Sequence, residues 1–289
     1  MKWLLFIVFP ILFLLSFALY QHLTINDGKL RVVFCDVGQG DAIFIRSPTG
    51  KVILFDGGPD KAVLSCLSDH LPLWQRTIDL MLLSHPHADH LNGLIDVLAR
   101  YSVLAFATEK LANTTTGYKA LEEAIQVERI STSFLHKGGV IRTTDGLTIR
   151  VLSPSQKYLE STSQDGVIKE SGEFASLIVL VSYKDFDVLL TGDTQSLQLS
   201  EALRQSSGQA IPQIEVLQVP HHGSRTGLTE DIVERLAPDT AVISVGKNSY
   251  GHPSPSTLNL LSKEGIKIER TDKRGQIVIV SDGSSYSMK

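Results

Sequence analysis

The sequence predicts an α/β protein of the αβ/βα type, a four-layer sandwich in which two mixed β-sheets pack together and helices cover both outer faces. Three observations support this fold. Strand-like and helix-like segments follow one another without a strict β-α-β order, which favours mixed sheets. The second half of the chain repeats the pattern of the first. A chain of 289 residues, 43% of them hydrophobic, can also bury one large core or two smaller ones.

The N-terminal segment, residues 1–24, is expected to form a hydrophobic helix ahead of the sandwich of residues 28–289. Residues 3–20 carry no charge, and about 18 apolar residues are the minimum for a helix that crosses the hydrocarbon core of a bilayer. Lys2 precedes this run and the next charge is Asp27, which favours a cytoplasmic N-terminus and an exported body. The alternative is a cleaved signal peptide, which would leave a secreted body.

The first half of the sandwich combines apolar runs of strand length with longer segments of helical periodicity. A tight turn at residues 47–50 joins two of the expected strands, and Pro72 follows the first expected helix. We expect strands at residues 30–36, 42–46, 51–55, 78–83 and 103–107, and helices at 60–71, 91–100 and 118–127.

The second half begins after a polar stretch without periodicity, residues 153–173, which is typical of a long loop. A hairpin of two apolar strands comes next, and the remaining strands and helices alternate. We expect strands at residues 177–183, 187–190, 214–219, 240–245, 266–270 and 276–280, and helices at 229–236, at 256–263 and from residue 196 onwards.

A cluster of metal-ligand side chains lies between an expected strand and the next helix. His85, His87, Asp89 and His90 fall within six residues of the segment Ser-His-Pro-His-Ala-Asp-His. Imidazole nitrogens and carboxylate oxygens suit zinc, manganese or iron. Ligands at a strand end have a rigid base and face a cleft. Surface solvation does not require three imidazoles and a carboxylate in one turn, so a metal site is favoured.

The pattern His-x-His-x-Asp-His resembles that of the metallo-β-lactamase superfamily, and further motifs follow around it in order. Together they resemble the metallo-hydrolase domain at the C-terminal end of the competence protein ComEC and its free-standing relatives, over residues 28–282. This resemblance implies the αβ/βα sandwich and two divalent metal ions, zinc or manganese. The other motifs are residues 36–41 (DVGQGD), 54–58 (LFDGG), 190–193 (LTGD), 219–224 (VPHHGS) and 244–253 (SVGKNSYGHP).

The expected ligands divide between two metal positions. His85 and His87 are two apart, so in an extended stretch their side chains point the same way and can share one ion. Asp89, also a candidate catalytic carboxylate, and His90 can reach a second ion at the turn into the helix. Asp193, at the end of an apolar strand, could bridge two ions about 3.5–4 Å apart; its alternative role is the N-cap of the helix from residue 196.

Two adjacent histidines follow a later expected strand and should perform different tasks. The resemblance assigns His222 as a metal ligand, and His221 would then bind the substrate or protonate a leaving group; the reverse assignment is the alternative. His252 could donate to a phosphate oxygen, and Lys247 could act there as a point charge.

Supporting residues are expected around these ligands. Asp56 would accept a hydrogen bond from a metal-binding imidazole and orient it, although a turn carboxylate is the alternative. Asp41 lies in a glycine-rich turn near the cleft mouth, where a structural role explains it equally well.

The chain departs from the wider superfamily pattern, which supplies a further histidine before the bridging aspartate. The histidine in that interval, His136, comes too early and is interpreted as a solvated loop residue. Glu173 or Ser176, or water, would complete the first metal site.

Composition and cysteine content restrict the alternatives. The formal net charge is −4, which argues against bulk duplex binding. The lysines and arginines of residues 137–150 and 263–274 are interpreted as solvated faces. Cys35 and Cys66 lack Cys-x-x-Cys spacing and are most simply buried, free thiols; a single disulfide in an oxidising compartment is the alternative.

These observations predict a binuclear metal-dependent phosphodiesterase in which a water shared by two cations attacks phosphorus as hydroxide. The resemblance implies DNA as substrate and a role in DNA uptake. A separate channel partner is then expected, because one hydrophobic segment cannot form a channel. The alternatives are an exported phosphoesterase for a small or cell-envelope substrate and, in a different class, a membrane-tethered binding protein with weak or no catalysis.

Overall fold

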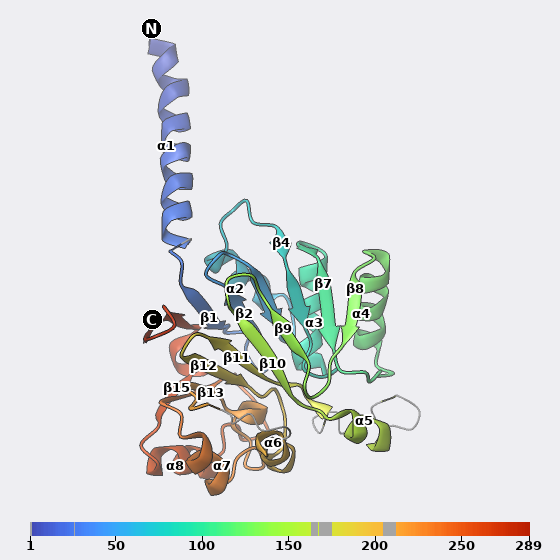
Figure 1. Cartoon of the computed structure of the whole chain (residues 1–289). Coiled ribbons are helices and arrows are strands. Elements are labelled where there is room, and N and C mark those ends of the chain that lie inside the picture. Colours follow the sequence, from blue (N-terminus) through green and yellow to red (C-terminus); the bar gives the residue numbers. More distant parts are fainter. Residues whose placement is uncertain (1, 26, 163–166, 168–174, 205–211) are drawn as a thin grey trace.

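The αβ/βα sandwich is confirmed in a computed structural model, which describes residues 2–25, 27–162, 167, 175–204 and 212–289 (Figure 1). Two mixed sheets form its middle layers. The first sheet comprises, in spatial order, β17 (Tyr286–Met288), β16 (Ile277–Ser281), β1 (Leu30–Phe34), β2 (Ile43–Arg46), β3 (Val52–Phe55), β5 (Leu80–Leu82), β7 (Ala105–Thr108) and β8 (Ser131–Phe134).

The second sheet faces the first across a shared apolar core. Side chains such as Ile43 and Phe55 from the first sheet and Val179 and Val188 from the second are fully buried in it. In spatial order this sheet comprises β15 (Lys267–Arg270), β14 (Thr240–Ile243), β13 (Val216–Gln218), β12 (Phe186–Leu190), β11 (Ile178–Tyr183), β10 (Thr148–Ser153) and β9 (Val140–Arg142).

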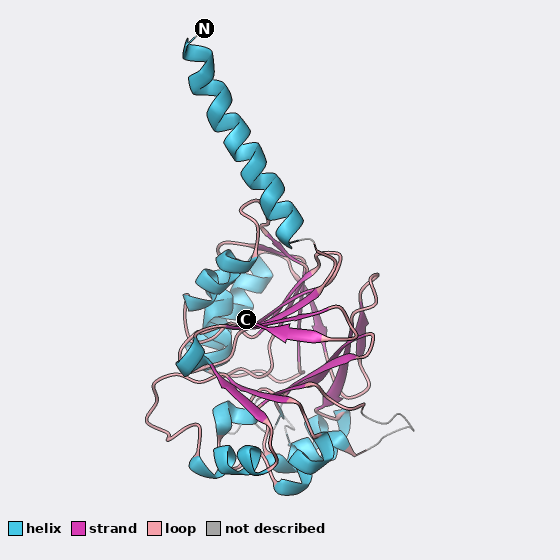
Figure 2. Ribbon diagram, turned by 90° about the vertical axis from the view of Figure 1, so that its left-hand side faces the viewer, coloured by secondary structure: helices cyan, strands magenta, loops and turns pink. Residues whose placement is uncertain are grey.

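Helices cover the two outer faces, as Figure 2 shows. Two further apolar cores lie beneath them, one between the first sheet and its helices and one between the second sheet and its helices. The first set is α2 (Ala62–His70), α3 (Ala88–Leu98) and α4 (Thr116–Val127), and the second is α6 (Ser196–Leu203), α7 (Glu230–Leu236) and α8 (Pro255–Lys263). The short helices α5 (Gln156–Thr162) and α9 (Thr271–Arg274) lie in connections.

Helix α1 (Lys2–Ile25) projects from the body of the molecule (Figure 1). The large apolar side chains that the structure describes in this helix are exposed, for example Phe6 at 77% and Phe9 at 74%. Within the described part of the chain, no helix combines the length and the hydropathy that a membrane crossing requires.

The strand directions determine where loops can converge. β3, β5 and β7 are parallel neighbours in the first sheet, and β12, β13, β14 and β15 are parallel neighbours in the second. In open α/β sheets, ligands bind beyond the carboxyl ends of such strands. The segments that follow β3, β5, β12, β13 and β14 contain all the sequence motifs except residues 36–41, which follow β1.

Several expected elements differ in detail from the structure. The run 78–83, apolar except for Asp79, forms two short strands, β4 (Thr77–Ile78) and β5. The Asp79 carboxylate between them accepts hydrogen bonds from the Lys51 side chain and from the Val52 backbone nitrogen. β4 pairs with β6 (Ser102–Val103) outside the main sheets. Helix α3 begins three residues earlier than expected, at Ala88.

Local periodicity also missed some elements. The prediction of a loop throughout residues 153–173 was wrong for Gln156–Thr162, which forms α5; residues 163–166 and 168–174 lie outside the described residues. Strands β8, β9, β10 and β17 were not predicted. β8 and β9 are short edge strands whose side chains are largely exposed, so they lack the apolar signal of a buried strand.

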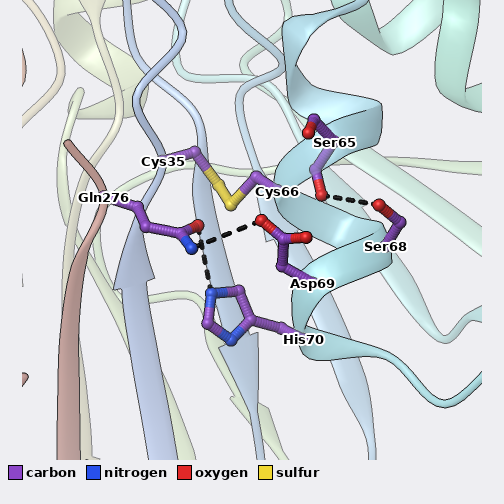
Figure 3. Close-up of a disulfide and its surroundings, with 7 residues drawn as sticks. All are labelled: Cys35, Ser65, Cys66, Ser68, Asp69, His70 and Gln276. Atoms are coloured by element: carbon purple, nitrogen blue, oxygen red, sulfur yellow. Dashed lines mark hydrogen bonds between the residues drawn. A yellow bond between two sulfur atoms is a disulfide. The ribbon is translucent and has the colours of Figure 1, made fainter.

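The prediction of free thiols at Cys35 and Cys66 was wrong, although both residues are buried. They form a disulfide between the segment that follows β1 and helix α2, with Cα atoms 5.7 Å apart (Figure 3). Beside it, Gln276 contacts both His70 and Asp69 of the same helix. A cross-link over 31 residues contributes about 3–4 kcal/mol in the chain-entropy model. Sequence spacing could not reveal this pair, because β1 and α2 meet only through the tertiary fold.

Candidate metal centre

The candidate centre lies where the carboxyl ends of the parallel strands of both sheets meet. Asp56 follows β3, and His85 follows β5. From the second sheet, Asp193 follows β12, and His222 follows β13 in the short 3-10 helix η2 (Pro220–Gly223). All four residues are at least 98% buried. The predicted convergence of side chains from distant parts of the chain is therefore present.

The turn into α3 brings Asp89 and His90 to this centre. His87 is the N-cap residue with an extended backbone, so Asp89 and His90 occupy the first helical turn. A carboxylate is stabilised there by the unpaired N–H groups and the dipole of the helix N-terminus. Gly93 lets the helix approach the preceding loop, because a Cβ at this position would lie 1.9 Å from the carbonyl oxygen of Gly57.

Three site residues have the left-handed backbone conformation that favours glycine. Asp56, His221 and His222 have φ values of 60°, 50° and 54°. Such conformations cost energy for residues with a Cβ and persist where the surroundings impose them, often at functional sites. Here the consequence is geometric: consecutive left-handed residues turn the two adjacent imidazoles in different directions, with their ring planes 73° apart.

Asp193 presents each of its carboxylate oxygens to different imidazoles. Its Oδ1 lies 3.3 Å from His90 Nε2 and 3.4 Å from His222 Nε2. Its Oδ2 lies 3.6 Å from His221 Nε2 and 4.0 Å from His85 Nε2. Two ligand atoms that each lie about 2.1 Å from one tetrahedral ion are about 3.4 Å apart. The distances from Asp193 Oδ1 to the two Nε2 atoms are therefore those expected between ligands of one ion. Asp193 Oδ2 faces a second position, next to His221 and His85.

Asp89 completes the Oδ1 side of the centre. Its Oδ2 lies 3.4 Å from His222 Nε2, and its Oδ1 lies 4.0 Å from His90 Nε2. The Asp89 side chain is 34% exposed, unlike the other members of the set. Asp89 is therefore the member of this set that lies at the solvent side of the centre. Asp193 does not cap α6, whose N-cap residue is Gln195.

Hydrogen bonds determine which ring nitrogen of each buried histidine faces the centre. The Ser84 hydroxyl donates to Asp56 Oδ2 at 2.6 Å and so accepts from His85 Nδ1 at 3.0 Å. His90 Nδ1 donates to the same Asp56 oxygen at 2.8 Å. With a proton on Nδ1, each neutral ring presents an Nε2 lone pair to the centre. Burial also holds the pKa of His85 well below its ordinary value, which favours the neutral ring.

The adjacent histidines of η2 receive opposite orientations. His222 Nδ1 donates to the Ser244 carbonyl at 2.9 Å, so its Nε2 is also a lone pair. His221 Nδ1 instead accepts from the side-chain amide of Gln195 at 3.0 Å, which leaves the proton of the neutral ring on Nε2. His222 therefore has the form of a ligand, and His221 has the form of a hydrogen-bond donor.

The chemistry of this donor set fits a cation. The Nε2 atoms of His85, His90 and His222 and the Oδ1 atom of Asp193 are buried and make no well-formed hydrogen bond. Buried polar atoms without partners are rare in proteins and call for an explanation. Lone pairs aimed at a common point, with a carboxylate among them, are what a divalent metal ion requires.

The electrostatics of the centre also favour positive charge. Burial lowers the pKa of His90, but the carboxylates of Asp193, Asp56 and Asp89 together hold it well above the ordinary value. Burial raises the pKa of Asp193, but His222 and His90 hold it well below the ordinary value. The buried carboxylates thus stabilise cationic neighbours.

Gln218 is a supporting residue that the sequence patterns did not indicate. Its side-chain nitrogen donates to Asp41 Oδ2 at 2.7 Å, and its side-chain oxygen accepts from the backbone nitrogens of Thr191 and Gly192. It therefore joins the glycine-rich turn of the first sheet to the turn that carries Asp193. A polar residue within an apolar strand was the signal that could have found it.

Asp41 lies behind the imidazoles, and burial raises its pKa to about 6. Its oxygens are 3.8 Å from the Nδ1 atoms of His90 and His222, which already have hydrogen-bond acceptors in Asp56 and Ser244. The ligand atoms of Asp41, His90, Asp193 and His222 all lie within 4.8 Å of one another. The Nε2 atoms of both rings lie near Asp193, and the side chain of Asp41 accepts a hydrogen bond from Gln218.

The remaining predicted residues occupy different positions around the centre. His87 is half-buried, with its ring centroid 4.4 Å from that of His85. The Ser176 hydroxyl accepts from the backbone nitrogen of Asp193 at 3.2 Å and so holds that turn. The ring of His252 is 5.3 Å from that of His221. His136 is exposed, as expected for a solvated loop residue. Glu173 lies outside the described residues, and Lys247 is exposed on the segment that leads to His252.

A model of the metallo-beta-lactamase superfamily matches residues 35–247, which include Asp193 and the imidazoles around it. The chain belongs to the metallo-β-lactamase superfamily. Membership supports a metal-dependent hydrolase in general, and it agrees with the buried lone pairs described above.

Curated relatives place the chain near the competence-protein branch of the superfamily, as the sequence resemblance implied. It is 27% identical over 275 residues to ComE operon protein 3 of Bacillus subtilis (strain 168), covering 87% of this chain and 33% of that protein. It is 28% identical over 269 residues to Recombination protein 2 of Haemophilus influenzae, covering 91% and 30%. The chain thus spans about a third of the length of these relatives.

A solved structure with the same fold is Igni18, described as a metallo hydrolase from the archaeon Ignicoccus hospitalis. Its TM-score is 0.54 at 14% sequence identity, with 86% of this chain and 98% of that chain covered. At this identity the likeness shows the metallo-β-lactamase fold alone.

Glu109 is a further buried acid at the same edge of the first sheet, directly after β7. Its side chain is fully buried, and burial raises its pKa to about 8. The Thr108 hydroxyl donates to Oε2 at 2.6 Å, whereas Oε1 has no hydrogen-bond partner. A carboxyl group at a strand end was the signal in the sequence, but its burial depends on the tertiary fold.

We expect Gln218→Leu to weaken metal binding by about 10- to 100-fold, because Asp41 and the Asp193 turn lose their common partner. The free energy of unfolding should also fall by about 1–3 kcal/mol. Metal titration and urea unfolding measure the two effects. Gln218→Glu keeps the acceptor oxygen and serves as the matched variant. Unchanged metal affinity in both variants would contradict this role of Gln218.

Glu109 should make the stability of the metal-free chain fall with rising pH. Its pKa is raised in the folded state, so its contribution is complete below the ordinary glutamate pKa and is lost as pH rises towards about 8. Glu109→Gln cannot ionise. The free energy of unfolding of Glu109→Gln minus that of the native chain should therefore increase from about pH 5 to pH 8, by on the order of a few kcal/mol.

Urea unfolding at several pH values tests this, with Glu123→Gln, an exposed glutamate of α4, as the control. A stability difference for Glu109→Gln that does not change with pH would show that Glu109 is ionised in the folded chain.

Proposed function

We propose that the chain is a binuclear metal-dependent phosphodiesterase that cleaves nucleic acid, with DNA as its substrate. One observation carries the proposal: Asp193 presents its Oδ1 to His90 and His222 and its Oδ2 to His85, and the Nε2 atoms of these three imidazoles are buried and have no hydrogen-bond partner. A carboxylate in this position can bridge two ions, and paired ions suit the displacement of a phosphodiester.

The residues divide between two metal positions. His85 and His87 would hold the first ion, with Asp193 Oδ2. The second ion would be held by Asp89, His90, His222 and Asp193 Oδ1. Zinc or manganese suits such nitrogen and oxygen ligands. Divalent ions bound there would supply Lewis acidity toward a phosphoryl oxygen and would make a water molecule more acidic.

The protein's own groups would orient the substrate and move protons. His221 carries the proton of its neutral ring on Nε2, so it can donate to a phosphate oxygen or to a leaving oxygen. His252, next to it, can donate to a second oxygen. Asp89, the partly exposed carboxylate, can accept a proton at the solvent side of the centre. The deeply buried Asp56 and Asp41 keep the ligand rings in place and meet no substrate.

The surface charge favours the binding of a short stretch of a nucleic-acid strand over sequence-independent binding of a duplex. Within residues 263–274, Lys267 and Arg274 pair with Glu269, and Arg270 pairs with Asp272. Such pairs leave little net positive charge for counterion release, which dominates non-specific duplex affinity. A separate channel partner for DNA uptake stays a prediction.

The metal centre can be tested with a simple phosphodiester, bis-p-nitrophenyl phosphate. We expect the purified chain to bind up to two divalent ions, to lose turnover with chelator and to regain it with zinc or manganese. The double variant His87→Ala/Asp193→Ala should lose metal and at least 100-fold in turnover, because both positions lose a ligand. His136→Ala, in an exposed loop, is the control. A folded double variant with native turnover would contradict the assignment.

We also propose that the domain works outside the cytoplasm, anchored through α1. The buried disulfide supports an oxidising compartment. The exposed apolar side chains of α1 support a lipid contact. When acid-quenched cells are extracted under denaturing conditions, Cys35 and Cys66 should react with an alkylating reagent only after reduction. The chain should also remain with the membranes after an alkaline wash. Alkylation of Cys35 and Cys66 without reduction would contradict this location.

A further inference from the structure

A hydrogen-bonded loop next to the metal centre presents an aromatic side chain to solvent. Residues 246–252 follow β14, and Asn248 organises them. Its side-chain nitrogen donates to the carbonyls of Gly246 and His252, and its side-chain oxygen accepts from the backbone nitrogens of Tyr250 and His252. Four hydrogen bonds from one side chain make this loop a preorganised platform. Tyr250 at its tip is 75% exposed.

Tyr250 is the outer end of a row of rings that leads to the buried ligands. Its ring centroid is 5.9 Å from that of His252, which is 5.3 Å from that of His221. The row continues from His221 to His222 at 6.1 Å and from His222 to His90 at 5.5 Å. Along this row, His252 alone lies between Tyr250 and His221, the proposed proton donor. His252 and His221 lie between Tyr250 and His222, a proposed metal ligand.

We propose that Tyr250 is the stacking platform for a nucleobase next to the scissile phosphodiester. This rests on the proposed function and names its substrate class as single-stranded nucleic acid. Every base has a π-face that stacks on an aromatic side chain without sequence preference. A base inside a duplex already stacks on both sides, so only an unpaired base is available to the Tyr250 ring.

The charge of the loop supports a nucleotide over a cationic head group. Residues 246–252 contain Lys247 and His252 and no carboxylate. A quaternary ammonium group favours an aromatic cage, which a lone exposed tyrosine beside a lysine does not provide. A base with its adjoining phosphates matches the loop, because the ring accepts the base while Lys247 and His252 attract the phosphates.

The test compares three substrates of the manganese-loaded full chain: single-stranded oligothymidylate, a duplex of the same length, and an abasic sugar-phosphate oligomer. We expect the native chain to favour oligothymidylate over both others. In Tyr250→Ala, the ratio of kcat/KM for oligothymidylate to that for the abasic oligomer should fall roughly tenfold or more. Tyr250→Phe should restore it. The control is Phe134→Ala, which removes an exposed ring from edge strand β8.

Binding of fluorescein-labelled oligothymidylate to the chelator-treated chain gives a readout that is independent of catalysis. Fluorescence anisotropy should show weaker binding for Tyr250→Ala and native binding for Tyr250→Phe. The proposal would be overturned by an unchanged substrate ratio in Tyr250→Ala or by a failure of Tyr250→Phe to restore it. It would also be overturned if Tyr250→Ala selectively lost turnover of a phosphocholine diester, assayed in parallel as a substrate with a cationic head group. A native chain that prefers the duplex would likewise overturn it. If the native chain cleaves none of the three substrates, the proposed function itself fails.

Discussion

The buried carboxylate of Asp193 is the interaction on which the rest of the structure depends. It lies among imidazoles from both halves of the sandwich, and an isolated carboxylate at this depth would cost many kcal/mol in lost solvation. Cationic neighbours must offset that cost. The folded chain therefore requires positive charge at this point, as bound metal or as protons on His90. Stability and ligand binding thus have the same electrostatic origin here.

A second layer of hydrogen bonds converts four similar histidines into different chemical groups. Ser84 and Asp56 direct the lone pairs of His85 and His90 toward the centre, and the Ser244 carbonyl does the same for His222. Gln195 reverses the arrangement at His221. Residue type alone therefore does not define a role: adjacent histidines of one turn differ because one nitrogen meets a carbonyl and the other meets an amide.

Most of the fold and of the centre could be predicted because the signals are local. The His-x-His-x-Asp-His cluster lies within six residues, and apolar runs indicated most buried strands. What was missed depends on tertiary contacts. Gln218 meets Asp41 across 177 positions, and Cys35 meets Cys66 across 31. Edge strands β8 and β9 are exposed and give no apolar pattern. The loop that contains Tyr250 was recognised as a motif, but the exposure of its ring required coordinates.

The disulfide between Cys35 and Cys66 stabilises a segment next to the metal centre. Cys35 immediately precedes the turn 36–41, and its backbone nitrogen donates to the Ala42 carbonyl at the other end of that turn. The cross-link therefore fixes the base of the segment that carries Asp41, whose side chain reaches Gln218 and, through it, the Asp193 turn. A reduced chain would lose this restraint on the side of the centre where no metal bond replaces it. An oxidising environment thus supports the arrangement of the ligands as well as the stability of the fold.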